Sequence, residues 1–162
     1  MSRVYISDTN IWIDFRNAGL LDELFELPFI FCCTDFVLDE LNNFDHAALL
    51  ERGLRVEQMD DTAVIKLYEL MTKHNNSSLA DVSCYFLAQE TARPLLTGDG
   101  RLRKQAQRDG LEVHGALWLL DRLVEHAVVS PKRAADCLDS ILLKNARLPH
   151  AECQARLQKW RG

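Results

Sequence analysis

Four acidic residues stand at places in the sequence where their carboxylates could act together. Asp8 and Asp99 each follow a short apolar run that has the length and composition of a β-strand. Asp81 lies in the first turn of an expected helix, and Glu40 lies on an otherwise apolar stripe of another. Two carboxylates about 4 Å apart repel each other by roughly 4 kcal/mol at an effective dielectric constant near 20, so a group of four needs protons or cations. If the four acids gather in the fold, they form a cation site.

A site made only of carboxylate oxygens suits Mg²⁺ or Mn²⁺, with water molecules completing the coordination. Zinc fits poorly, because the five histidines and five cysteines show no paired spacing of the kind that zinc sites use. A divalent cation held by carboxylates lowers the pKa of a bound water and neutralises charge that builds on phosphoryl oxygens. The four acids therefore favour phosphodiester hydrolysis, which would require no histidine base.

Each acid also has an explanation that involves no chemistry. Asp8 and Asp99 could cap helices or shape turns, and Ser78 with Asp81 completes the pattern of a capping box. Glu40 could turn its carboxylate toward the solvent. Only the combination favours a site, and it requires the first and fourth strands to be neighbours in the sheet.

The elements that must position these acids follow from hydrophobic periodicity and turn residues. Strands are expected at 4–6, 29–33, 54–59, 94–97 and 111–115. Helices are expected at 11–27 with a break at Gly19, and at 34–44, 60–71, 79–90, 101–110 and 116–127. This alternation predicts an α/β fold with a parallel sheet covered by helices on both faces. Ligands bind such sheets beyond the carboxyl ends of the strands, where Asp8 and Asp99 are expected.

The chain has 162 residues, which is enough for one domain with a substantial core. We expect the main domain to cover residues 1–128 and a helical extension, 129–162, to pack on it. Ser130–Pro131 and Pro149 mark the starts of two helices in that extension. No segment approaches the roughly 20 apolar residues of a membrane span, and the odd number of cysteines suits a reducing compartment. The expected location is the cytoplasm.

Several motifs occur together in a recognisable order. SDTNIWID follows the first strand, an acid lies within FVLDEL, and SLADVSCYFLA precedes LLTGDGRLRKQA and LEVHGALWLLDRLV. Over about residues 3–126 the chain resembles a bacterial PIN domain of the VapC-like group, and TGDGRLR with HGALWLLD is the most specific part. In one departure, Arg101 follows the GDG turn where some members carry a further acid, which leaves open whether one or two metals bind.

The resemblance implies a three-layer α/β/α PIN-like fold with a central parallel sheet of about five strands, plus C-terminal helices. It implies an endoribonuclease that depends on Mg²⁺ or Mn²⁺ and cuts RNA. The catalytic and metal-binding acids that it implies are Asp8, Glu40, Asp81 and Asp99. It also implies that Thr9, Asn10 and Thr97 orient the carboxylates and water. The family context adds a role as the toxin of a toxin–antitoxin pair, with an antitoxin protein or a second copy of the chain as partner.

The net charge of −5 is unusual for a protein that binds nucleic acid, although two divalent cations would cancel four of the negative charges. The helix after Asp99 carries basic residues that could contact RNA phosphates or could form a solvated face: Arg101, Arg103, Lys104 and Arg108. Trp12 and Phe15 could stack on bases, but we favour core packing for both.

Two other functions stay open on the sequence alone. A phosphohydrolase of the haloacid-dehalogenase type also uses an acidic loop like TGDG, but its nucleophile needs Asp-x-Asp after the first strand. Here Thr9 and Asn10 follow Asp8, so that pattern is missing. A PIN-like module that binds RNA or protein without cutting would keep the same fold and lack the activity.

Overall fold

The computed structural model describes residues 3–73, 77–145 and 147–162, and the loop expected at 73–78 falls partly outside them. Its five strands are β1 (Arg3–Ser7), β2 (Phe29–Thr34), β3 (Arg55–Glu57), β4 (Leu95–Leu96) and β5 (Val113–His114). They form one sheet in the order β3-β2-β1-β4-β5, and every pair is parallel. The predicted parallel sheet is confirmed. Strands β1 and β4 are neighbours, and the strand order reverses between them.

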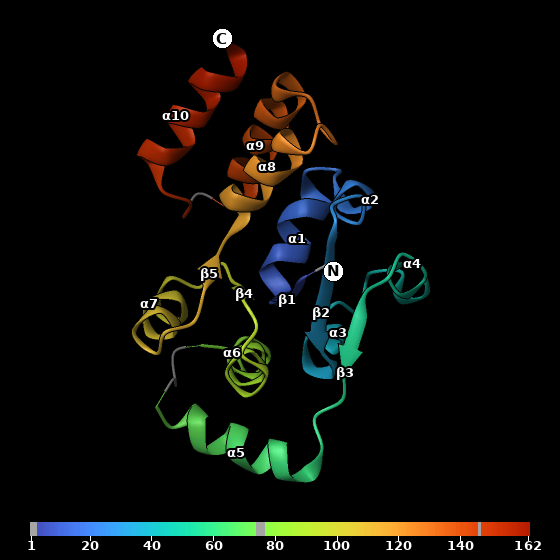
Figure 1. The fold of residues 1–162 in the computed structure, drawn as a ribbon, viewed down its shortest axis with the longest axis vertical. Coiled ribbons are helices and arrows are strands. Elements are labelled where there is room, and N and C mark those ends of the chain that lie inside the picture. The colour runs from blue at the N-terminus through green and yellow to red at the C-terminus, as the bar shows by residue number, and fades with distance from the viewer. Residues whose placement is uncertain (1–2, 74–76, 146) are drawn as a thin grey trace.

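Helices surround the sheet (Figure 1). They are α1 (Thr9–Asn17), α2 (Leu21–Leu24), α3 (Asp35–Glu40), α4 (His46–Glu51), α5 (Asp61–Met71), α6 (Leu79–Thr91), α7 (Gly100–Arg108), α8 (Ala116–Glu125), α9 (Pro131–Lys144) and α10 (His150–Arg161). Helix α6 packs on the sheet and in turn contacts α3, α5 and α7. Helix α1 contacts α8 and α9, and α10 packs on α9 at the upper end of Figure 1.

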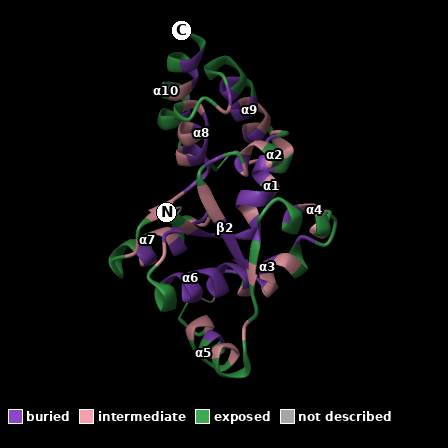
Figure 2. Cartoon of the chain, turned by 45° about the vertical axis from the view of Figure 1, so that its right-hand side comes forward, coloured by how far each residue is buried: buried purple, intermediate pink, exposed green. Residues whose placement is uncertain are grey.

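Successive side chains along β1 and β2 point to opposite faces of the sheet, and different helices cover the two faces. On one face, the ring of Trp118 in α8 lies 5.4 Å from that of Tyr5 and 5.7 Å from that of Phe29. On the other face, the hydroxyl of Thr34 hydrogen-bonds that of Ser83 in α6, at 2.7 Å. Residues 80–88 of α6 are all buried, as Figure 2 shows. The three-layer α/β/α architecture is therefore confirmed.

The burial of two aromatic residues of α1 decides between base stacking and core packing, the two roles that the sequence left open for them. Trp12 and Phe15 are completely buried, and the ring of Trp12 packs 5.7 Å from that of Phe31 in β2. The core-packing interpretation is confirmed, and base stacking by either residue is wrong because neither ring reaches the surface.

The helix expected at 34–44 is shorter than predicted. Helix α3 ends at Glu40, and Leu41 already leaves the helical conformation with ψ at 44°. Asn42 and Asn43 follow at once, and asparagine side chains compete for the backbone hydrogen bonds that a helix needs. The sequence also did not indicate helix α4. As a result, Glu40 stands at the end of a helix rather than in the middle of one.

The C-terminal helices begin where the sequence predicts. The hydroxyl of Ser130 accepts the N–H of Arg133 at 3.1 Å, and Pro131 is the first residue of α9. Ala134 and Leu138 are fully buried in the same core as the sheet. The division into 1–128 and 129–162 stays a prediction. Among the described residues, no helix is long and apolar enough to cross a membrane.

Candidate functional site

Asp8 and Asp99 lie at the carboxyl ends of neighbouring strands, and each caps a helix. The Oδ1 atom of Asp8 accepts the N–H of Ile11 at the start of α1, at 3.2 Å. The Oδ1 atom of Asp99 accepts the N–H groups of Arg101 and Leu102 at the start of α7, at 2.9 and 3.1 Å. The capping explanation is therefore confirmed for both residues. It uses one oxygen of each carboxylate.

The other oxygen of Asp8 is held by the TGDG loop. Its Oδ2 atom accepts the hydroxyl of Thr97 at 2.6 Å and the N–H of Gly98 at 3.0 Å. The same Thr97 oxygen accepts the N–H of Asp99 at 3.0 Å, so one hydroxyl links the two acids. Asp8 is fully buried, and this burial raises its pKa against the opposing effect of the three hydrogen bonds.

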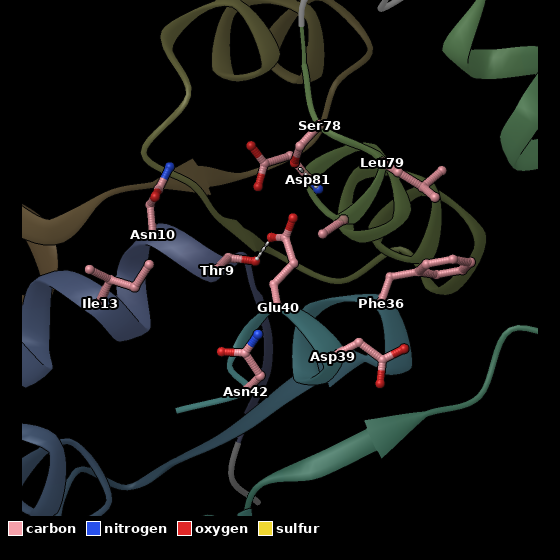
Figure 3. Close-up of a pocket in the computed structure, with 11 residues that line it drawn as sticks. Thr9, Asn10, Ile13, Phe36, Asp39, Glu40, Asn42, Ser78, Leu79 and Asp81 are labelled. Atoms are coloured by element: carbon pink, nitrogen blue, oxygen red, sulfur yellow. Dashed lines mark hydrogen bonds between the residues drawn. The ribbon is translucent and has the colours of Figure 1, made fainter. Parts of the chain in front are cut away.

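Glu40 reaches the site from the last turn of α3. Its exposed carboxylate accepts the hydroxyl of Thr9 at 2.6 Å, which Figure 3 shows as a dashed line. The adjacent Asp39 points away from this contact in the same view. The shortened helix places Glu40 beside the first residue of α1, so the bond joins the helices that follow β1 and β2.

Asp81 lies in the first turn of α6, and only 7% of its surface is exposed. Its N–H donates to the hydroxyl of Ser78 at 3.0 Å, which is the first half of the expected capping box. Burial raises the pKa of Asp81 to about 7, and the negative charges of Asp8, Asp99 and Glu40 also contribute to the rise, in that order. The four acids therefore share one electrostatic environment, although they come from four separate segments of the chain.

An open pocket of about 730 Å³ lies beside these acids, with Glu40 and Asp81 on its walls (Figure 3). The remaining lining residues come from α1, α3, α6 and the segments next to them: Thr9, Asn10, Ile13, Phe36, Asp39, Asn42, Ser78, Leu79 and Ala80. In Figure 3, Asn10 stands at the edge of the pocket across from Asp81. The pocket exposes carboxylate and amide groups to a ligand that enters from solution.

The basic residues of α7 differ in what they contact. Arg101, Lys104 and Arg108 are exposed. The Nη2 of Arg103 instead donates to the carbonyl of Thr97 at 3.1 Å. A Cβ atom on Gly115 would lie 2.1 Å from that Nη2, so only glycine leaves room for the guanidinium. Arg103 thus supports the loop that holds Asp8.

Two polar residues at the site were not singled out from the sequence. The hydroxyl of Ser77 donates to Oδ2 of Asp99 at 2.8 Å, but nothing distinguishes it in a run of polar residues. Asp14 is buried in α1, and burial raises its pKa to about 6 despite a hydrogen bond from Asn145. Asp14 did carry a sequence signal, because it lies between Ile13 and Phe15 near the candidate Asp8.

The chemistry of the donors fits a hard divalent cation. Within residues 3–73, 77–145 and 147–162, no three Asp, Glu, His or Cys side chains form a complete metal-binding group by themselves. Mg²⁺ does not require one, since it keeps several waters and uses one or two carboxylates plus substrate phosphates. Asp8 and Asp81 are buried acids, and the charges that act on Asp81 come from other acids. A cation would relieve this repulsion.

The cysteines do not contribute to this site. All five thiols are free and buried, as expected for small apolar side chains. Burial raises the pKa of Cys32 to about 11 and that of Cys33 to about 12, so both stay protonated at neutral pH.

Comparisons with known proteins agree with this architecture. A family model described as PIN domain matches residues 4–162. The PilT N-terminus domain protein SSO1118 of Sulfolobus solfataricus has a similar structure, with a TM-score of 0.52 at 15% identity over 76% of this chain and 95% of that one. PAE2754 of Pyrobaculum aerophilum is similar with the same TM-score and identity, over 77% and 99% of the two chains. Comparison with curated proteins finds no match. The family match covers nearly the whole chain, and the chain therefore belongs to the PIN-domain family, whose members are generally nucleases.

Proposed function

We propose that this protein is an endoribonuclease that depends on Mg²⁺ or Mn²⁺ and hydrolyses RNA phosphodiester bonds. The observation that carries the proposal is the arrangement of the four acids: the hydroxyl of Thr97 links Asp8 to Asp99, and Glu40 and Asp81 line the open pocket beside them. Such a cluster is costly to keep unless it binds cations. Membership of the PIN-domain family supports nuclease chemistry at this site.

The proposed ligands of the cation are Asp8, Glu40, Asp81 and Asp99. A cation bound there supplies an activated water and offsets charge on the phosphoryl oxygens. The protein's own residues then orient the ligands. Thr97 holds one oxygen of Asp8, and Thr9 does the same for Glu40.

One further group at the site has a proposed role. Asn10 lines the pocket and offers an amide N–H to a phosphate or a water.

Exposed cations next to Asp99 are proposed to contact the RNA backbone. Arg101 and Lys104 are exposed in the first turns of α7, and within the described part of the chain neither side chain forms a hydrogen bond or an ion pair, so both are free to reach a phosphate. RNA contact by Arg103 also stays a prediction. We favour it less than contact by Arg101 and Lys104, because the guanidinium of Arg103 already donates to the carbonyl of Thr97. The VapC-like toxin role, an antitoxin partner, a homodimer and a cytoplasmic location also stay predictions.

The test is cleavage of a mixed RNA pool by the purified protein with Mg²⁺, with Mn²⁺ and with EDTA. Asp99→Asn, prepared identically, is the variant, and a phosphomonoester substrate checks for the haloacid-dehalogenase type of activity. We expect cutting that needs the metal and falls at least ~100-fold in the variant. Cutting in EDTA, or equal cutting by Asp99→Asn, would refute the assignment. A protein that binds the pool but never cuts it would instead be a non-catalytic module.

A further inference from the structure

The pocket that Glu40 and Asp81 line is called the acidic pocket below, and a second, smaller pocket of about 150 Å³ adjoins it along α1. Asn10 and Ile13 line both, and Figure 3 shows these two residues together on one side of the larger pocket. The other lining residues of the smaller pocket are Asp14, Asn17, Lys144, Asn145 and Arg147. We refer to it as the basic pocket, because Lys144 and Arg147 line it.

The cations of the basic pocket have charge available for a ligand. Lys144 is the last residue of α9, and Arg147 lies three positions further along the chain; both are exposed. Neither side chain lies within ion-pair distance of an acid among the described residues, although the charge of Arg147 acts on the nearby Asp14 and lowers the pKa of that carboxyl. Other arginines of the chain do form ion pairs: Arg3, Arg52, Arg122, Arg133, Arg156 and Arg161.

Asn145 fixes these cations relative to the acidic pocket. Its Nδ2 donates to both carboxylate oxygens of Asp14, at 3.2 and 3.4 Å, and its Oδ1 accepts the N–H of Arg147 at 3.2 Å. Asp14 is buried on α1, four residues after Asn10, and so lies on the same helix face about 6 Å further along. The end of α9 is therefore attached to the helix that Asp8 caps.

We propose that the basic pocket binds a phosphate that flanks the scissile one on the same RNA strand, with Lys144 and Arg147 as its cationic ligands. The inference rests on the proposed function, because it needs an RNA strand in the acidic pocket. The guanidinium of Arg147 suits two phosphate oxygens at once, while Lys144 acts as a point charge. Asn10, which lines both pockets, and Asn17, which lines the basic pocket, add neutral donors.

The charge of the whole protein favours such a subsite. A chain with a net charge of −5 that gathers four acids at one place repels a polyanion there. Cations close to the acids offset that repulsion, and each phosphate that they neutralise also releases counterions. The basic pocket provides two such cations at a position that leads directly into the acidic pocket.

The test is binding of a short fluorescent single-stranded RNA, measured by anisotropy in EDTA so that no cutting occurs. The site variant combines Lys144→Gln with Arg147→Gln. The control variant, Lys66→Gln with Lys132→Gln, removes the same charge from exposed positions outside the basic pocket. Lys132 is also on α9, 12 residues before Lys144, and so about 18 Å away along the helix.

We expect the site variant to bind about 10-fold more weakly at about 100 mM KCl. The magnitude of the slope of log K against log salt should fall by about 0.7, since the site variant loses one phosphate contact and each such contact with a single strand contributes ~0.7. The control should change by less than about 3-fold. Equal weakening in both variants, or no weakening in the site variant, overturns the inference.

Two further results separate the possible failures. If the wild type cuts RNA with Mg²⁺ while both variants bind alike, this inference fails and the proposed function stands. If the wild type neither binds nor cuts RNA, the proposed function fails and takes this inference with it. A labelled poly-aspartate peptide that binds the wild type but not the site variant, with RNA binding unchanged, would assign the pocket to an acidic protein partner and also overturn the inference.

Discussion

Replacing Asp81 by asparagine should stabilise the metal-free protein while it abolishes activity. Folding raises the pKa of this carboxyl from 3.8 to about 7, first through burial and then through the charges of Asp8, Asp99 and Glu40. The ionised form is thus less favourable in the folded than in the unfolded chain. The asparagine side chain would keep the shape and carry no charge, so the repulsion within the cluster should decrease.

The magnitude follows from the shift and depends on pH. Three pKa units correspond to about 4 kcal/mol, and side-chain movement with water entry should leave at least half, ~2 kcal/mol, at pH 8. A group whose folded pKa is raised contributes most stability below its unfolded pKa and loses it as the pH rises through the folded value. At pH 5 the folded carboxyl of Asp81 is still protonated, so the gain there should be below about 1 kcal/mol.

The assay is thermal unfolding in EDTA at pH 5 and pH 8. For a chain of this length, about 2 kcal/mol corresponds to a rise in Tm of roughly 4–8 °C at pH 8. Asp61→Asn is the matched control, because Asp61 also lies in the first turn of a helix but is exposed. There a carboxylate favours the helix terminus, so this control should lose a little stability. A lower Tm for Asp81→Asn at pH 8, or a gain that does not change with pH, would refute the reasoning.

Three further predictions test the site and its support. Mg²⁺ at about 100 times its Kd should stabilise the wild type by ~3 kcal/mol in thermal unfolding, and EDTA should reverse this; an equal shift in Asp8→Asn would contradict the proposed ligands. Thr97→Val should cost about 1–3 kcal/mol and most of the RNA cleavage, because Asp8 and the N–H of Asp99 both lose a partner, whereas Thr97→Ser should keep both. Gly115→Ala should lower the free energy of unfolding by about 1 kcal/mol, because the added Cβ displaces Arg103 from the carbonyl of Thr97. In an Arg103→Met background the same substitution should cost nothing. If the effects of the two substitutions on stability are additive, the contact between Gly115 and Arg103 does not explain the cost.

Periodicity predicted much of the architecture, because the buried strands and helices carry regular apolar patterns. The five strands, the break at Gly19 and the helix starts at Ser78 and Ser130 all follow from local signals. The end of helix α3 did not follow from such signals, because the apolar spacing continues through Phe44 whereas the helix ends at Glu40, before Asn42 and Asn43. The short helix α4 has too few residues for a clear period.

The sequence was less informative about which polar groups meet across the fold. The Thr97–Asp8 hydrogen bond joins residues 89 positions apart, and the Asn145–Asp14 bond joins residues 131 apart. Such pairs have no local period, so only the packed structure identifies them. The basic row in α7 shows the same limit, because Arg103 has the sequence context of a surface cation and yet bonds a backbone carbonyl.

Capping and metal binding are compatible roles for Asp8 and Asp99, although they first stood as alternatives. A carboxylate offers about four lone-pair positions, and each of these acids accepts three hydrogen bonds. The capping bonds use Oδ1 in both cases, which fixes the carboxylate at a helix N-terminus. Among the residues that the structure describes, Oδ2 of Asp99 then accepts a hydrogen bond only from the hydroxyl of Ser77, a group that can rotate away when a cation binds. A carboxylate that is fixed by its cap and still has a free lone pair is well suited to serve as a metal ligand.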